Sequence, residues 1–132
     1  MAQNSVSVPI PPGELIDKIT ILQIKSERIE NAQKLHNVKT ELTAVTEVRN
    51  HSLPDDEQLN DIATCLKAVN EELWDIEDRI RLCERDGEFG EPFIQLARSV
   101  YKTNDHRAFL KRQINELLGS ELVEEKDYAK YD

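Results

Sequence analysis

The chain has 132 residues, of which 39% are hydrophobic and 5% aromatic, so it suits one domain with an aliphatic core, because two independent cores would be too small. It carries 17 Lys and Arg against 26 Asp and Glu, a formal charge of −9, which argues against the basic surface that nucleic-acid or membrane-surface binding needs. Its apolar runs are far shorter than a membrane span and no signal peptide is recognised, so we expect no membrane insertion.

Residues 1–12 are expected to form an extended arm. Three prolines forbid a helix in this stretch: Pro9, Pro11 and Pro12. Apolar residues alternate with others along it: Val6, Val8 and Ile10. The arm is therefore suited to lie in a groove or to pair with a partner strand, and a mobile tail is the alternative.

From Glu14 the apolar residues recur with the spacing of a helix. One stripe consists of Leu15, Ile19, Leu22 and Ile29, with Ser26 in the remaining place. A second stripe consists of Leu35, Val38, Leu42 and Val45. The two stripes do not join in register across Asn31–Ala32, so we expect a skip or bend there, before a turn at "NHSLPDD".

The second predicted helix has the most regular pattern. Its apolar seam alternates spacings of three and four and consists of Leu59, Ile62, Leu66, Val69, Leu73, Ile76, Ile80 and Cys83. If it runs from about Pro54 to Arg85 it is about 48 Å long, whereas a compact chain of this length has a radius of gyration of about 14 Å. We therefore predict that the first two helices form an elongated antiparallel hairpin with a coiled-coil-like seam.

Two cysteines bear on the compartment. Cys65 and Cys83 lie in the same predicted helix, which separates them by roughly 27 Å. A disulfide needs Cα atoms within about 7 Å, so the two cannot pair within the chain. Free thiols indicate a reducing compartment, and we expect the cytoplasm.

A third helix is predicted from Pro92 to Leu118, packed on the hairpin. Its seam consists of Phe93, Leu96, Val100, Leu110, Ile114 and Leu117. Because Asn104 and Asp105 are also suitable helix caps, this helix is either continuous or begins anew near Thr103. The whole chain is thus an all-α single domain, residues 1–132, with a short helical or flexible tail at 120–132.

The thin hairpin leaves part of its apolar stripe uncovered. We therefore expect the protein to self-associate as a homo-oligomer, with a dimer as the first expectation.

Positive charge gathers between Arg98 and Arg112, where five Lys or Arg accompany a single acid, Asp105. Thr103 and Arg107 fall at seam positions that are otherwise apolar, so the Arg107 guanidinium must find a partner or reach water. Three readings stay open: a pair with an acid of the hairpin that fixes register, an anion site, or a solvated basic face. The anion site would comprise Arg98, Tyr101, Lys102, Asn104, Arg107 and Lys111.

Two short stretches are similar to all-helical enzymes. "EELWDIED" is similar to half of the metal site of the nucleotide pyrophosphohydrolases, which implies Glu72 and Asp75 as magnesium ligands. "IDKITILQIKSERIENAQKLHNVK" is similar to the first long helix of the chorismate mutases, which implies Arg28 and Lys39 as substrate-binding cations. The three histidines are scattered and no Gly-rich phosphate loop is present, so we expect neither a metal nor a cofactor.

Three longer segments carry a resemblance over residues 12 to 131: "PGELIDKITILQIKSERI", "VNEELWDIEDRIR" and "FIQLARSVYKTNDHRAFLKRQINELLGSELVEEKDYAKY". Together they resemble a family of small bacterial proteins classed as a domain of unknown function, which implies no activity. The resemblance marks two regions: a possible partner patch of Glu14, Asp17, Lys18 and Thr20, and the cluster from Arg98 to Arg112. If the third helix runs back along the hairpin, Asp17 is a natural partner for Arg107 or Lys111.

The sequence therefore predicts a non-catalytic binding or assembly module whose cationic site recognises an anionic small molecule or an acidic protein partner. The alternative is a small cofactor-free enzyme acting on a phosphorylated or carboxylated metabolite. That alternative requires a closed pocket with a titrating group aimed into it, such as Asp17, Asp105 or His106.

Overall fold

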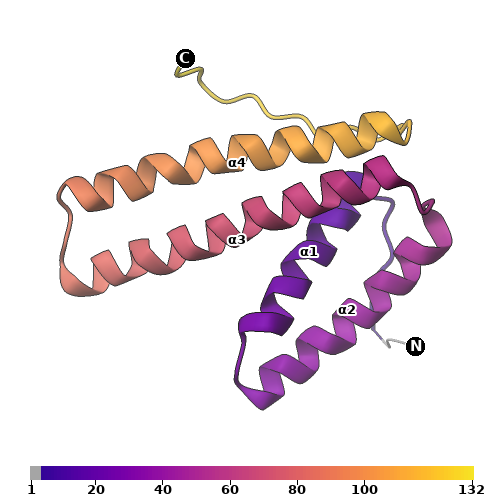
Figure 1. Cartoon of the computed structure of the whole chain (residues 1–132), viewed down its shortest axis with the longest axis horizontal. Helices are drawn as coiled ribbons and strands as arrows, with labels where there is room; N and C mark the ends of the chain where they lie inside the picture. Colours follow the sequence, from indigo (N-terminus) through magenta and orange to yellow (C-terminus); the bar gives the residue numbers. More distant parts are fainter. Residues whose placement is uncertain (1–3) are drawn as a thin grey trace.

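The computed structural model describes residues 4–132, and within them every regular element is a helix. The helices are α1 (Pro12–Arg28), α2 (Ala32–Ser52), α3 (Glu57–Asp86) and α4 (Glu91–Leu117). Figure 1 shows α3 and α4 side by side as a long antiparallel hairpin, with α1 and α2 as a shorter pair that leans away from it. The all-α prediction is confirmed. None of these four helices is both long enough and apolar enough to cross a lipid bilayer.

The chain breaks fully where the sequence predicted a skip or bend. α1 ends at Arg28, Ile29 is extended, and Asn31 caps α2 by accepting a hydrogen bond from the Lys34 amide at 2.9 Å. α2 therefore folds back on α1, and its backbone approaches no other of the four helices, although Arg49 donates to Asn60 of α3 at 3.4 Å. The long hairpin differs from the predicted one, because α4 rather than the first helical segment lies along α3.

The ends of α3 have identifiable local causes. Asp56 accepts a hydrogen bond from the Leu59 amide at 3.0 Å and so caps the N-terminus, two residues after Pro54. At the other end Gly87 has φ of +68°, a left-handed conformation that residues with a Cβ adopt at a cost. α4 then runs without interruption through Thr103, so the alternative in which a new helix begins there is wrong.

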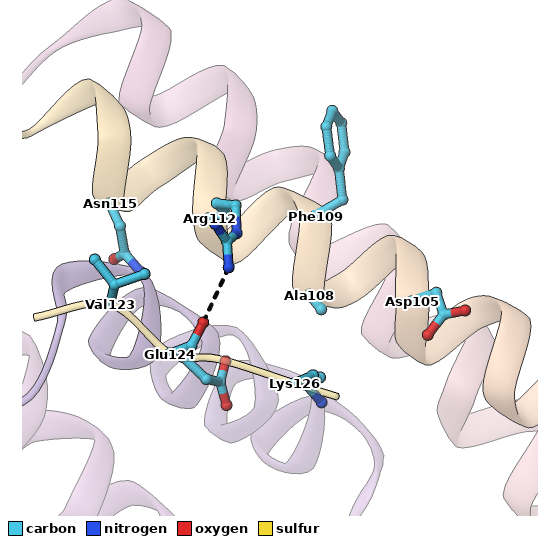
Figure 2. Close-up of a pocket in the computed structure, with 8 residues that line it drawn as sticks. All are labelled: Asp105, Ala108, Phe109, Arg112, Asn115, Val123, Glu124 and Lys126. Carbon is cyan, nitrogen blue, oxygen red and sulfur yellow. Dashed lines mark hydrogen bonds between the residues drawn. The ribbon is translucent and has the colours of Figure 1, made fainter. Parts of the chain in front are cut away.

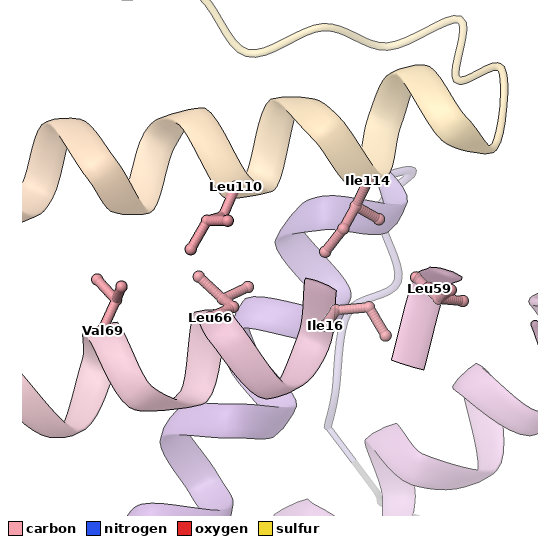
Figure 3. Close-up of a cluster of buried hydrophobic side chains, with 6 residues drawn as sticks. All are labelled: Ile16, Leu59, Leu66, Val69, Leu110 and Ile114. Carbon is pink, nitrogen blue, oxygen red and sulfur yellow. The ribbon is translucent and has the colours of Figure 1, made fainter. Parts of the chain in front are cut away.

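The core lies where α1 crosses the hairpin. Figure 3 shows its members from three helices pointing toward one another: Ile16 of α1, Leu59, Leu66 and Val69 of α3, and Leu110 and Ile114 of α4. Leu59, Leu66 and Ile114 are completely buried. Farther along, towards the turn between α3 and α4, seam residues such as Leu73 and Ile80 are only half-buried. Burial thus declines along the hairpin once α1 no longer covers it.

Both ends of the chain are non-helical. Residues 5–11 are extended and lead into α1, while residues 1–3 of the predicted arm lie outside the described part of the chain. The segment 121–132 has no helix, and after the turn that follows α4 it runs back along that helix (Figure 1). This return brings the acidic C-terminal segment onto the helix that carries the cationic cluster.

Candidate functional site

One buried carboxylate joins three helices. Asp17 of α1 is 1% exposed, and Arg107 of α4 binds it through both arms, with Nε 2.9 Å from Oδ1 and Nη2 2.5 Å from Oδ2. Asn70 of α3 donates from Nδ2 to the same Oδ1 at 2.9 Å. The carboxylate is thus held by a planar bidentate fork and an amide, the geometry that gives charge-assisted hydrogen bonds their strength.

The network closes on itself through Thr20. Its hydroxyl donates to the backbone carbonyl of Asp17 at 2.8 Å and accepts from Asn70 Nδ2 at 2.9 Å. In residues 4–132 every buried side-chain nitrogen or oxygen has a hydrogen-bond partner. A satisfied buried network of this kind fixes how α1 sits on α3 and α4.

Lys111, one turn after Arg107, is also buried, at 7% exposure. Its Nζ lies 2.8 Å from Glu14 Oε2, 3.1 Å from Glu124 Oε1 and 3.9 Å from Asp17 Oδ2. Burial by itself would lower the pKa of Lys111, but hydrogen bonds to Glu14 and Glu124 and attraction by Asp17 outweigh it, so the pKa is raised. The pKa of Arg107 is likewise raised, chiefly by its hydrogen bonds to Asp17. Both cations therefore stay charged and paired.

A close approach of two backbones positions this network. The amide of Gly13 in α1 donates to Asn115 Oδ1 in α4 at 2.7 Å. A Cβ at residue 13 would lie 2.4 Å from the Lys111 carbonyl oxygen, so glycine allows the two helices to meet. Glu14 and Asp17 follow directly, and this brings them to Lys111 and Arg107.

The opposite side of α4, which we call the outer face, carries the exposed residues Arg98, Tyr101, Lys102, Asp105, Phe109 and Arg112. Arg112 Nη2 lies 3.3 Å from the carbonyl oxygen of Glu124 (Figure 2). The same nitrogen lies 3.3 Å from Glu125 Oε2. The chain's own acidic segment therefore lies on this face.

Near its end the segment makes a second attachment. Tyr131 donates its hydroxyl to Asp105 Oδ2 at 2.5 Å, and its ring meets Tyr101 edge-on with centroids 5.1 Å apart. The hydrogen bond to the Asp105 carboxylate raises the pKa of Tyr131 to about 12. Between segment and helix the structure leaves cavities of about 310 Å³, shown in Figure 2, and about 560 Å³. The segment is thus attached at two places without filling the face.

The predicted cationic residues divide between the two sides of α4. Arg107 and Lys111 point inward to Asp17 and Glu14, as the pairing hypothesis expected, and Asn104 lies beside Arg107. Three others lie on the outer face: Arg98, Tyr101 and Lys102. The six residues therefore do not form one site.

Of the predicted partner patch, Thr20 joins the buried network, whereas Lys18 is exposed and pairs with Glu41 of α2 at 2.9 Å. Sequence reasoning missed Asn70 and Asn115. Neither side chain carries a charge, so no signal in the sequence marks them as buried groups that need partners.

The residues implied by enzyme resemblances lie elsewhere. Arg28 donates to Asp75 at 2.6 Å and lies 5.8 Å from the centre of the Trp74 ring. Glu72 and Lys39 are exposed on α3 and α2. Among residues 4–132 no three His, Cys, Asp or Glu side chains are grouped so that they could hold a metal ion. Asp75 and Arg28 therefore serve each other as partners.

With this geometry described, comparison with known proteins gives one result. The family of unknown function DUF6165 matches residues 6–131. The chain belongs to this family. The resemblance over the whole length is thereby confirmed, and the family's description assigns no activity. No curated protein and no solved structure matches the chain.

Proposed function

We propose that this member of DUF6165 is a non-catalytic helical binding module that recognises an acidic partner segment through the outer face of α4. Arg107 is already paired with Asp17, so it contributes little to an outside anion, whereas Lys111 is paired with Glu14 and also contacts Glu124 of the C-terminal segment. The outer face retains exposed cations and aromatic rings: Arg98, Lys102, Arg112, Tyr101 and Phe109. Cations interleaved with aromatic side chains suit an acidic polypeptide that also carries apolar or aromatic residues.

The observation that supports this proposal is the position of the C-terminal segment. It is an extended acidic stretch with two tyrosines, and it lies on the outer face through Arg112 at one end and Asp105 at the other. The segment therefore serves as an example, within the same chain, of the kind of ligand that the face accommodates.

The attachment is open to exchange. All residues from 121 to 132 are exposed, and exposed ion pairs such as Arg112–Glu125 contribute about 1 kcal/mol or less. Glu124 also contacts the buried Lys111, so a competing segment needs an acid at the same place. The cavities beneath the segment show that a better-fitting occupant would bury more surface. A partner with an acidic and aromatic segment is thus able to replace it.

Catalysis has less support from the geometry. Asp17 is fully engaged by Arg107 and Asn70, while Asp105 and His106 are exposed on the surface of α4. A general acid or base needs a position within reach of a bound substrate. The arrangement therefore favours binding over a reaction.

Self-association forms the second part of the proposal. The half of the α3–α4 hairpin that α1 leaves uncovered exposes three large apolar residues: Leu82, Phe89 and Ile94. A second copy is the partner that would always be present to cover them. Both cysteines are free, Cys65 being exposed, which suits a reducing compartment such as the cytoplasm. Measurement of the mass in solution tests self-association, because a strict monomer at high concentration contradicts it.

A competition experiment tests recognition by the outer face. A chain that ends at Ser120 is titrated with a fluorescent peptide of residues 121–132, and we expect saturable binding that weakens as salt increases. The full-length chain should bind the same peptide more weakly, because its own segment competes at an effective concentration in the millimolar range. Arg112→Glu should abolish binding, whereas Arg85→Glu, an equal charge change on exposed α3, should not. Equal binding by both variants, or none by the shortened chain, contradicts the proposal.

A further inference from the structure

A groove of about 500 Å³ lies between α1, α3 and the inner side of α4, away from the outer face. Its apolar lining comes from Ile21 and Ile24 of α1 and from Leu73 and Trp74 of α3. Polar groups stand at one end, where Asn70, Asn104 and Arg107 line it. An apolar floor with a few convergent donors is the usual composition of a binding groove.

The donors at that end are held in place and incompletely used. Asp17 occupies Nε and Nη2 of Arg107, and Nη1 makes only a long contact of 3.5 Å to Asn104 Oδ1. The side chain of Arg107 is 29% exposed. Asp17 neutralises the guanidinium. Glu77, Asp78 and Arg81 line the same groove, and Arg81 is paired with Glu77, so a neutral acceptor fits better than a free anion. Backbone carbonyl groups are such acceptors.

The N-terminal arm has the matching chemistry. Val6 and Val8 are 90% and 69% exposed, although they are apolar and flank an extended backbone. Pro9 and Pro11 lack amide hydrogens, and Pro11 has φ of −63° and ψ of 149°, the polyproline II conformation. Extended segments of this type dock in aromatic-lined grooves, where their carbonyl groups accept hydrogen bonds from side chains.

The lengths of arm and groove also agree. The residues of α3 that line the groove extend from Asn70 to Arg81, about 16 Å along the helix axis. Six residues of polyproline II, from Val6 to Pro11, span about 19 Å. The arm joins α1 at its start, beside Asn115, whereas the groove residues Ile21 and Ile24 lie in the second half of that helix. Within its own chain the arm leaves Val6 and Val8 exposed.

We propose that the arm, residues 4–11 of one copy, binds in the α1–α3–α4 groove of a second copy. Val6 and Val8 would cover the floor beside Trp74, while arm carbonyls accept hydrogen bonds from Arg107 Nη1 and the Asn104 amide. This contact rests on the self-association part of the proposed function and uses none of the interactions of the outer face.

Trp74 provides the measurement, because it is the single tryptophan of the chain and it lines the groove. A full-length chain with Val6→Ser and Val8→Ser, whose own arm is disabled, is titrated with a synthetic peptide of residues 4–11. We expect a saturable shift of Trp74 emission to shorter wavelength as water leaves the ring. The same peptide with both valines replaced by serine should give no shift, and neither should the peptide of residues 121–132.

A groove variant completes the test. Asn104→Asp keeps the acceptor for Arg107 but removes the amide donor and occupies Nη1, so the arm peptide should bind about tenfold more weakly. In sedimentation, the unaltered chain should dimerise and the Val6→Ser, Val8→Ser chain should shift to monomer. Absence of a Trp74 shift overturns the proposal. A dimer that persists in the Val6→Ser, Val8→Ser chain overturns the arm contact while leaving self-association through the hairpin intact. If the unaltered chain is monomeric and yet binds the peptide, a second copy is excluded as the occupant of the groove.

Discussion

Arg107 and Asp17 are 90 residues apart in the chain and form a bidentate pair in which the carboxylate is almost completely buried. This contact joins the first helix to the last. The acid from another helix therefore explains why an arginine interrupts the apolar seam. Both charges lose hydration on burial, and their attraction for each other offsets that cost.

Removing the guanidinium should destabilise the fold strongly. Arg107→Leu leaves Asp17 charged and buried without its main partner, and we expect a loss of about 3–5 kcal/mol in the free energy of unfolding. Urea denaturation measures it. The matched control is Arg112→Leu on the exposed side of α4, which should change stability by about 0.5 kcal/mol or less. Equal effects of the two substitutions would show that the pair contributes nothing particular.

Asn70→Asp changes the charge of the network with almost no change in shape. The new carboxylate replaces an amide that lies 2.9 Å from Asp17 Oδ1 and also removes the donor to Thr20. We expect a loss of about 3 kcal/mol or more at neutral pH, since a buried donor becomes a like charge. Gln58→Glu, on the exposed N-terminal part of the same helix, is the control and should be nearly neutral. If Asn70→Asp is as stable as the control, the expected repulsion between the two carboxylates is contradicted.

Gly13→Ala tests the close contact of α1 with α4. Its Cβ would lie 2.4 Å from the Lys111 carbonyl oxygen and 2.8 Å from Asn115 Oδ1, so one helix must move. Overpacking of this kind costs about 1–3 kcal/mol, and the amide–Asn115 hydrogen bond should weaken as well. Gly90→Ala meets nothing within 4 Å and alters only a helix cap, with an expected cost of about 1 kcal/mol or less. Thermal unfolding of the two variants ranks them, and the reverse order would contradict the predicted steric clash.

Tyr131 should titrate late. Its hydrogen bond to Asp105 raises its pKa in the folded state to about 12, above the ordinary tyrosine value of about 10. The contact therefore stabilises the folded segment below about pH 10 and is lost as pH rises towards 12. Tyrosinate absorbance should show a component with a midpoint near 12, which Asp105→Asn moves down and Tyr131→Phe removes. A component unaffected by Asp105→Asn would mean that the segment is not attached there.

The helices themselves were predictable, because each is bounded by local chemistry. The heptads of α3 located it to within a few residues, and the register break at Asn31 marked the junction of α1 and α2. The pairing of helices was not predictable, since an apolar stripe shows which side of a helix is buried and not which neighbour buries it. The chain reverses between α1 and α2, so these two helices form a short pair and do not make one long helix along α3. α4 occupies that place instead.

The candidate site divides in a similar way. A buried charge requires an opposite one, and the resemblance marked the region of Asp17, so Asp17 could be suggested from sequence as a partner for Arg107 or Lys111. Asn70 and Asn115 carry no charge and occur in patterns that equally suit exposed residues, so nothing in the sequence required a partner for them. The segment after Ser120 has no periodicity that orients it, and its contacts with Lys111 and Arg112 appear only in three dimensions.

α2 has no buried residue, packs against α1, and reaches α3 only through an exposed hydrogen bond from Arg49 to Asn60 among the contacts described. It can therefore detach while the core around Leu66 and Ile114 stays closed, which makes it a separate unit of local unfolding. In native-state hydrogen exchange, amides of α2 should open at a free energy well below that of global unfolding, whereas those in the middle of α3 should report the global value. We therefore expect α1, α3 and α4 to stay folded together while α2 unfolds and refolds many times during the lifetime of one folded molecule.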